Sequence, residues 1–226
     1  MSDLSQIRTL AEDELITEPG FYAITLERHH DQPCDGFSVT SGILRTMELE
    51  TPDRVWAFSK SNPDRYIRPS SDALRMGQAM ATYVEGGEEL IETQVRVLPA
   101  DKPNKPTAAQ IARHAEGKAT EAGLRSIEFW ENVDLDPRTI ITQEQYDLIV
   151  AMGSALKRDP AAAAALGGIP ELTMAWQDEA TGIWCLSRPD QVDFSGMLSD
   201  YKKVSTQGRP FKAHQMDRKI EAYGYL

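Results

Sequence analysis

The chain has 226 residues, of which 41% are hydrophobic, and no apolar run approaches the length that a bilayer crossing requires. Its 35 acidic and 24 basic side chains give a net charge of −11, so nucleic acid can bind only where the cations are concentrated. Its 2 cysteines exclude a disulfide framework, and the amino terminus lacks the basic and apolar segments of a secretory signal. These features predict a cytoplasmic protein that does not contact a membrane.

Helical and extended patterns follow one another along the chain. Residues 1–36 are polar and acidic, apart from a candidate strand over residues 20–26, and we interpret them as an N-terminal extension. Residues 37–226 are predicted to form one domain. Hydrophobic periodicity and cap residues predict helices over residues 41–58, 71–84, 107–132, 142–157, 160–166 and 211–223. Apolar runs between turn signals predict strands over residues 91–98, 171–176, 182–188, 191–194 and 197–202.

Helices that precede a run of strands, with one more helix after it, indicate an α+β fold. The last two predicted strands are joined by Ser195 and Gly196, which favour a tight turn. Because neighbouring strands lie about 4.8 Å apart, this hairpin is expected to bring Asp190 close to Asp200. Glu171 opens an earlier strand and is expected to add a third carboxylate at the same end.

This arrangement of acids is typical of a Mg²⁺-dependent phosphodiesterase. Asp190 is followed ten residues later by Asp200-Tyr201-Lys202, and carboxylate oxygens are the ligands that a hard, octahedral cation prefers. Lys202 lies two residues after Asp200, so both side chains point to the same face of a strand. Its ammonium group is placed to hold the attacking water or a phosphate oxygen. The alternative is that these are ordinary hairpin charges that face water.

Several other residues are candidates for binding. Arg188 directly precedes Pro189 and Asp190, and it either pairs with a site carboxylate or touches DNA. Ser41 lies near a predicted helix N-terminus with Arg45 one turn later, which suits a 5′ phosphate; helix capping and a solvated arginine are the alternatives. The histidines at positions 29 and 30, with Asp31 and Cys34, have no zinc-site spacing and predict a surface loop.

Cations gather in two stretches of the chain. The stretch near the amino terminus contains Arg54, Lys60, Arg65 and Arg68. The stretch near the carboxyl terminus contains Lys202, Lys203, Arg209, Lys212, Arg218 and Lys219. Each is interpreted either as a solvated face or as part of a channel for a nucleic-acid backbone.

The segment over residues 171–202 resembles the PD-(D/E)XK nuclease superfamily. More narrowly, it is similar to the C-terminal nuclease domains of the exodeoxyribonuclease VIII family, relatives of lambda exonuclease. Three further segments resemble motifs of that family in the same order: a Ser-x-Ser-x-Leu-like helix entry at residues 37–45, a Gly-x-Ala helix at residues 74–80, and a Tyr-containing helix at residues 141–152.

The resemblance implies a restriction-endonuclease-like core, with a central mixed sheet flanked by helices. It implies a 5′-to-3′ exonuclease that needs Mg²⁺, for which Mn²⁺ substitutes, and that acts on linear duplex DNA ends to leave 3′ single-strand overhangs. Implied partners are a single-strand annealing protein and further copies of the chain in a ring, in the cytoplasm of a bacterial host and encoded by a phage or prophage. Implied metal ligands are Asp190, Asp200, Glu171 and the Tyr201 carbonyl, with Lys202 catalytic.

Two features depart from the family pattern. Ala81 stands where the family commonly has a histidine, and the chain ends at Leu226, where a Gln-x-x-x-Tyr helix is expected to follow. We therefore expect weak or absent activity in this form, with an exposed apolar patch beside the strands that carry Asp190 and Asp200. Two alternative functions remain open. One is an inactive nuclease-fold protein that binds DNA ends or a partner, and the other is a structure-selective endonuclease.

Overall fold

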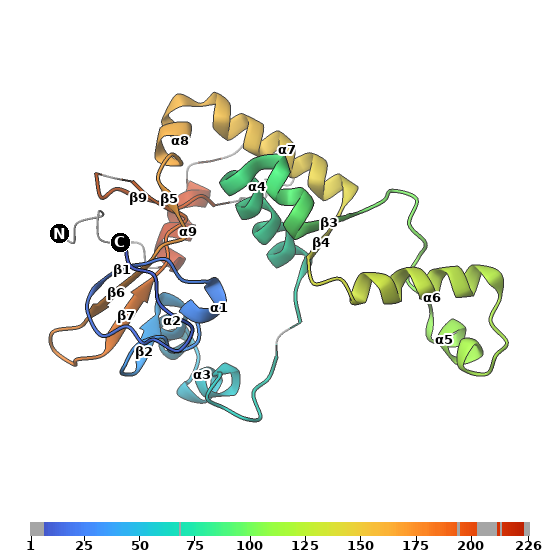
Figure 1. Ribbon diagram of the computed structural model, residues 1–226, viewed down its shortest axis with the longest axis horizontal. Coiled ribbons are helices and arrows are strands. Elements are labelled where there is room, and N and C mark those ends of the chain that lie inside the picture. The colour runs from blue at the N-terminus through green and yellow to red at the C-terminus, as the bar shows by residue number, and fades with distance from the viewer. Residues whose placement is uncertain (1–6, 68, 194, 203–211, 213, 224–226) are drawn as a thin grey trace. The chain divides into compact units, whose positions relative to one another are not determined.

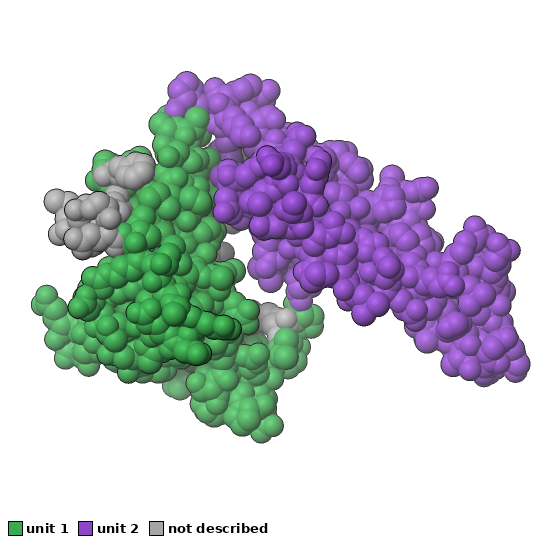
Figure 2. Space-filling model, in the orientation of Figure 1, with its two compact units in different colours: residues 1–69, 161–226 green, residues 70–160 purple. Residues whose placement is uncertain are grey.

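The computed structural model describes residues 7–67, 69–193, 195–202, 212 and 214–223, and the chain divides into two compact units (Figures 1 and 2). Unit 1 comprises residues 1–69 and 161–226, and unit 2 comprises residues 70–160. Unit 2 is therefore one continuous segment between the two halves of unit 1. The predicted boundary at residue 36 stays a prediction, although part of the segment before it contributes a strand to unit 1.

Unit 1 is built on a four-stranded mixed sheet, in the order β1-β6-β7-β2. Its strands are β1 (Gly20–Tyr22), β2 (Ser38–Thr40), β6 (Thr173–Gln177) and β7 (Trp184–Ser187). The β1–β6 and β6–β7 pairs are antiparallel, whereas β2 and β7 are parallel, with Val39 opposite Cys185. The α+β class with a mixed sheet flanked by helices is thus confirmed at this level.

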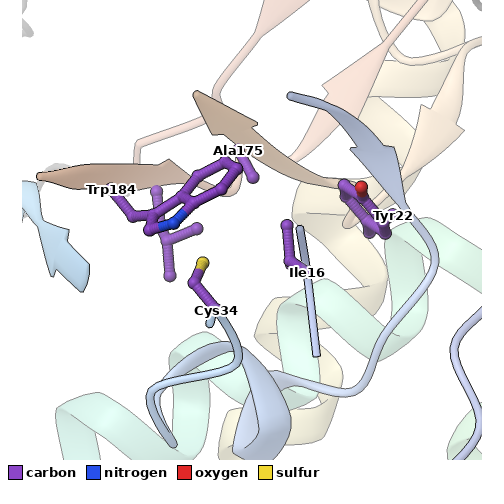
Figure 3. Packing of buried hydrophobic residues seen from close by; sticks show 6 residues of the cluster. Ile16, Tyr22, Cys34, Ala175 and Trp184 are labelled. Carbon is purple, nitrogen blue, oxygen red and sulfur yellow. The ribbon is translucent and has the colours of Figure 1, made fainter. Parts of the chain in front are cut away.

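Apolar side chains from distant parts of the chain form the core on this sheet (Figure 3). Trp184 and Tyr22 are almost completely buried, and each satisfies its polar atom. The indole Nε1 donates to Asp35 Oδ1 at 2.8 Å, and the tyrosine hydroxyl donates to the Glu18 carbonyl at 2.6 Å. Cys34 lies in the same cluster, and burial raises the pKa of its thiol to about 12.

The second cysteine lies on β7 of the same sheet. The apolar run around Cys185 predicts a buried thiol, but the side chain is only half-buried, because β7 alternates between buried and partly exposed positions.

A second, antiparallel sheet in unit 1 carries the predicted hairpin. Its strands are β5 (Ile169–Pro170), β8 (Gln191–Val192) and β9 (Leu198–Ser199). The turn between β8 and β9 contains Gly196 at φ +84°, a conformation that favours glycine. Asp193 Oδ1 accepts from the backbone N–H groups of Ser195 and Met197, which fixes the turn.

The helices of unit 1 are α1 (Leu26–His29), α2 (Ser41–Leu49), α3 (Pro52–Phe58), α8 (Pro160–Ala165, from the unit boundary) and α9 (His214–Tyr223). The prediction of one helix over residues 41–58 is wrong, because the helical conformation is interrupted between α2 and α3. Pro52 disfavours the helical conformation at Thr51, which instead caps α3.

Unit 2 consists of α4 (Asp72–Gln94), β3 (Val95–Leu98), α5 (Ala108–Ala115), α6 (Glu121–Asp134), β4 (Thr139–Thr142) and α7 (Gln143–Arg158). The strands β3 and β4 pair in parallel, and α4 and α7 contact both the strands and each other (Figure 1). Ser71 caps α4 as predicted.

Two predictions for unit 2 are wrong. Residues 91–94, predicted as part of a strand, continue α4, which runs past a kink at Gly87 (φ +64°). The helix predicted over residues 107–132 is two helices, because Gly117 adopts φ +69° and Thr120 caps α6. Among the described residues, no helix has both the length and the apolar character that crossing a membrane requires.

Candidate active site

The hairpin of unit 1 brings the two central acids of the motif together. Asp190 immediately precedes β8 and Asp200 immediately follows β9, while Gln191 pairs with Ser199 across the ladder. The carboxyl groups of Asp190 and Asp200 share a hydrogen bond. The backbone N–H of Tyr201 donates to Asp190 Oδ2 at 2.8 Å. The predicted proximity of the two aspartates is therefore observed.

The electrostatics of this pair favour a bound cation. Burial raises the pKa of Asp190 to about 7, and the hydrogen bond and negative charge of Asp200 act in the same direction. The Tyr201 N–H and the Lys202 ammonium oppose the shift without cancelling it. A divalent cation bound by both carboxylates would offset the repulsion between them.

Lys202 and Tyr201 complete this end of the site. The Lys202 ammonium forms an ion pair with Asp200 Oδ1. Both residues lie beyond β9, so the strand predicted over residues 197–202 is wrong for this end, and the ion pair does not depend on a shared strand face. Tyr201 is predicted to offer its carbonyl to a metal, and the group that lies against Asp190 is its amide nitrogen.

Glu171 lies beside Asp190 in the fold, but its carboxylate is already paired with another side chain. Its Oε2 accepts from Arg188 Nε at 2.6 Å, and its backbone N–H donates to the Asp190 carbonyl at 3.3 Å. Its φ of +55° is a left-handed conformation that is rare for a side chain of this kind. Such strain is found mainly where the surrounding structure fixes a functional residue.

Arg188 is held inside unit 1 by three acceptors. Besides Glu171, its Nη1 donates to the Ile24 carbonyl at 2.7 Å and to Thr173 Oγ1 at 3.3 Å. Its side chain is 12% exposed. Of the two predicted roles, pairing with a site carboxylate is the one observed, and the DNA contact stays a prediction.

The surface loop predicted for His29 and His30 is wrong for His29. Thr25 caps α1, and His29 on this helix is 4% exposed. Burial, with the neighbouring His30 and Arg188, lowers the pKa of His29 to about 4, so the ring is neutral.

The Nδ1 atom of His29 lies 3.0 Å from Thr173 Oγ1. The Thr173 hydroxyl is fully buried, accepts from Arg188 Nη1 and shares a hydrogen bond with His29 Nδ1. His29, Thr173, Arg188 and Glu171 thus form one hydrogen-bonded chain. The sequence feature that could have indicated this arrangement is Thr25. It caps α1 and so places His29 on a helix rather than in a loop.

Three members of this hydrogen-bonded chain, His29, Arg188 and Glu171, line a cavity of about 710 Å³ in unit 1. Its walls come from α1, the start of α2, the end of β7 and the hairpin, and they include His29, His30, Thr40, Ser41, Glu171, Arg188, Asp190 and Asp200. Ser41 is the first residue of α2, and Thr40 rather than Ser41 caps the helix. Arg45 is not among the described residues that line this cavity.

Some predicted features lie outside the described residues. These are Arg68, Lys203, Arg209, the side chains of Lys219 and Tyr223, and Tyr225. Within the described part of the chain, no group of three His, Cys, Asp or Glu side chains is arranged to hold a metal ion. The predicted third acid, Glu171, does not join the aspartates in such a group, in keeping with its pairing to Arg188.

No family model, curated protein or solved structure matches this chain. The family resemblance therefore stays a prediction that rests on the motif residues, and the functional argument rests on the geometry around Asp190 and Asp200.

Proposed function

We propose that this protein is a Mg²⁺-dependent DNA nuclease with a PD-(D/E)XK-type core. The supporting observation is the Asp190–Asp200 pair, partly desolvated beside Lys202 at the wall of a cavity. Such a pair is unfavourable as two free anions and becomes favourable around a divalent cation.

The donor set fits a hard cation in part. Asp190 and Asp200 supply carboxylate oxygens, and Mn²⁺ substitutes for Mg²⁺ because it accepts the same oxygen ligands. Glu171 is anchored to Arg188 through Oε2, and its carboxylate forms part of the cavity wall. A bound Mg²⁺ supplies Lewis-acid activation of water and neutralises charge on the phosphate.

The chain's own groups supply the rest of the reaction. Lys202, whose ammonium pairs with Asp200 in this structure, would orient the attacking water or a phosphate oxygen. The Tyr201 N–H keeps Asp190 in one orientation. Ser41, at the start of α2, lies where a phosphate oxygen can accept from a helix N-terminus, and Arg45 follows one turn later.

The finer proposal follows the family resemblance. The enzyme acts 5′-to-3′ on linear duplex ends, leaves 3′ overhangs for an annealing protein, and works as a ring-shaped homo-oligomer in the cytoplasm of a bacterium that carries the phage or prophage.

The test compares linear duplex, closed circular duplex and single-stranded DNA with Mg²⁺ and with EDTA. We expect the protein to degrade linear duplex, and neither of the other two substrates, in Mg²⁺ and not in EDTA. The Asp200→Asn variant should be folded but inactive. Cleavage of closed circles would favour the structure-selective endonuclease.

A non-catalytic protein that binds DNA ends or a partner is the second candidate. The observation that favours it is that Glu171 and Lys202 are both paired within the protein, and that the described residues include no three-acid metal group. DNA-end binding without cleavage in Mg²⁺ or Mn²⁺ would identify that function.

A further inference from the structure

A second cavity of unit 1, of about 610 Å³, adjoins the candidate active site. The two cavities share His30, Thr40 and Gly42 in their walls. The two cavities are therefore neighbours on the α1–α2 side of the active site.

The walls of the second cavity are mainly apolar and aromatic. They come from α2, α3 and the segment over residues 59–67. Tyr66 and Phe58 meet edge to face with ring centroids 5.6 Å apart, and the Arg54 guanidinium lies 4.7 Å from the Phe58 centroid. Tyr66 is 59% exposed, so a face of its ring is open to a ligand.

The position of Tyr66 is fixed by the chain around it. Its backbone N–H donates to the Ala57 carbonyl at 2.8 Å. The Asn62 side chain donates to the Trp56 carbonyl at 3.1 Å, and the Arg65 N–H donates to the Asn62 carbonyl at 3.2 Å. The segment is thus folded back on the end of α3, and the ring is presented at a defined place.

The charges at this cavity differ from those of the whole chain. Among the described residues that line it, Arg54, Lys60 and Arg65 are cations and none is acidic. Arg54 pairs with Glu50 at 2.9 Å and Lys60 pairs with Asp31 at 3.3 Å, so a bound phosphate would compete with these two carboxylates. The protein as a whole carries a net charge of −11. An apolar, aromatic floor beneath a cationic rim suits a flat aromatic group that carries negative charge.

We propose that this cavity binds an unpaired terminal nucleotide of DNA, with its base stacked on Tyr66 and its phosphate among Arg54, Lys60 and Arg65. The inference builds on the proposed nuclease function and adds a feature of the substrate: a frayed or single-stranded end. Continuity with the Asp190–Asp200 site through His30 and Thr40 places that nucleotide next to the phosphate to be cut.

The test uses binding without cleavage, in EDTA, with single-stranded oligonucleotides that carry the fluorescent base aminopurine at either terminal nucleotide. Stacking is expected to quench the fluorescence at one end. Tyr66→Ala should abolish the quenching and weaken binding about tenfold. Arg65→Gln should lower the slope of log K against log salt by about 0.7.

Trp56→Ala is the matched control. Trp56 is 54% exposed on α3 but does not line the cavity, so its removal should leave binding and quenching unchanged. Equal losses in the two aromatic variants, or no loss with Tyr66→Ala, would overturn the proposal. So would an oligonucleotide with abasic ends that binds as tightly as the intact one, because only phosphates would then be held.

The result is separable from the proposed function. Tyr66-dependent quenching by a protein that cuts nothing in Mg²⁺ would support the nucleotide cavity and remove the nuclease. If the wild type shows no quenching and Tyr66→Ala still cleaves DNA, the nuclease function would be supported and the nucleotide cavity would be ruled out.

Discussion

Arg188 lies between a carboxylate, a hydroxyl and a carbonyl, and these contacts define its role. The Glu171 side chain is 33% exposed, and the guanidinium is the counter-charge that holds its carboxylate in place. The side chain therefore acts on the site through Glu171, as a positioning residue. Its bond to Thr173 extends the same constraint to His29.

A double-mutant cycle tests this pairing. Arg188→Gln should lower the free energy of unfolding by about 2–3 kcal/mol, because it leaves the Glu171 carboxylate without its partner. Glu171→Gln with Arg188→Gln should recover part of that loss, with a coupling of about 1–3 kcal/mol. Urea denaturation in EDTA measures all four proteins; additive losses would mean that the two side chains act independently.

Lys202 is expected to contribute in the transition state rather than in binding. Lys202→Ala should reduce turnover about 100-fold or more, while DNA affinity changes little, because the ammonium acts on the attacking water or the phosphate. Lys118→Ala in unit 2, an exposed position, is the control. A variant that loses DNA binding but retains turnover per bound DNA would reduce Lys202 to a phosphate contact.

Asp190 and His29 should affect stability in opposite directions over the same pH range. The pKa of Asp190 is raised from 3.8 to about 7, so its contribution to stability is full below pH 4 and is lost as the pH rises to 7. The pKa of His29 is lowered from 6.5 to about 4, so its contribution is full above pH 6.5 and is lost as the pH falls to 4.

Single variants separate the two. In EDTA, Asp190→Asn should lose stability more steeply than the wild type between pH 6.5 and 4, and His29→Gln should lose it less steeply. Urea denaturation at several pH values measures this. If the stability of all three proteins changes with pH in the same way, the fold does not shift the pKa of either group.

At the scale of elements, the closest packing in unit 2 is between α4 and α7. A Cβ built on Gly153 of α7 would lie 2.1 Å from Cε1 of Tyr83, whose ring is buried on α4. On α4 itself, Gly77 has open space, since a Cβ added there would meet no other atom within 4 Å. One helix glycine is therefore required by packing and the other is not.

Replacing each glycine by alanine should have opposite effects. Gly153→Ala should lower stability by about 1–3 kcal/mol, since overpacking outweighs the gain in helix propensity. Gly77→Ala should raise it by about 0.5–1 kcal/mol. Thermal unfolding measures both, and a stabilising Gly153→Ala would mean that the two helices are not in contact.

The elements also show which features the sequence can predict. The site hairpin is predictable because its signals are local: a Ser-Gly turn, short apolar runs, and acids at both ends. The helix break before Pro52 and the helix cap at Ser71 also depend on local sequence signals. Hydrophobic periodicity alone, however, predicts a continuous helix across the break before Pro52. The extension of α4 through residues 91–94 is not predictable in this way, because alternation over so short a run fits a strand equally well.

Long-range contacts account for the features that local sequence patterns do not predict. The parallel pairing of β2 with β7, and the strand β1 within the segment interpreted as an extension, join positions far apart in the chain. The pairing of Glu171 with Arg188 and the burial of His29 follow from that assembly. Residue types alone indicate an acidic site, and only the fold shows that two acids meet while the third is paired with a cation.

At the scale of the whole molecule, unit 2 is a continuous insertion with a core of its own. Its buried side chains come from α4, β3, α6, β4 and α7: Met76, Met80, Tyr83, Ile91, Val95, Leu98, Ile127, Val133, Ile141 and Ile149. Its two strands would be marginal alone, but α4 and α7 pack on them. A segment that closes its own core is expected to fold without the rest of the chain.

Residues 70–160, expressed alone, should therefore be helical by circular dichroism and should unfold in one cooperative transition. Gly153→Ala should lower the melting temperature of this fragment as it does in the full chain, because Tyr83 and Gly153 both belong to it. Gly77→Ala, which should raise the melting temperature, is the control. A fragment that melts without cooperativity would mean that the core of unit 2 depends on unit 1.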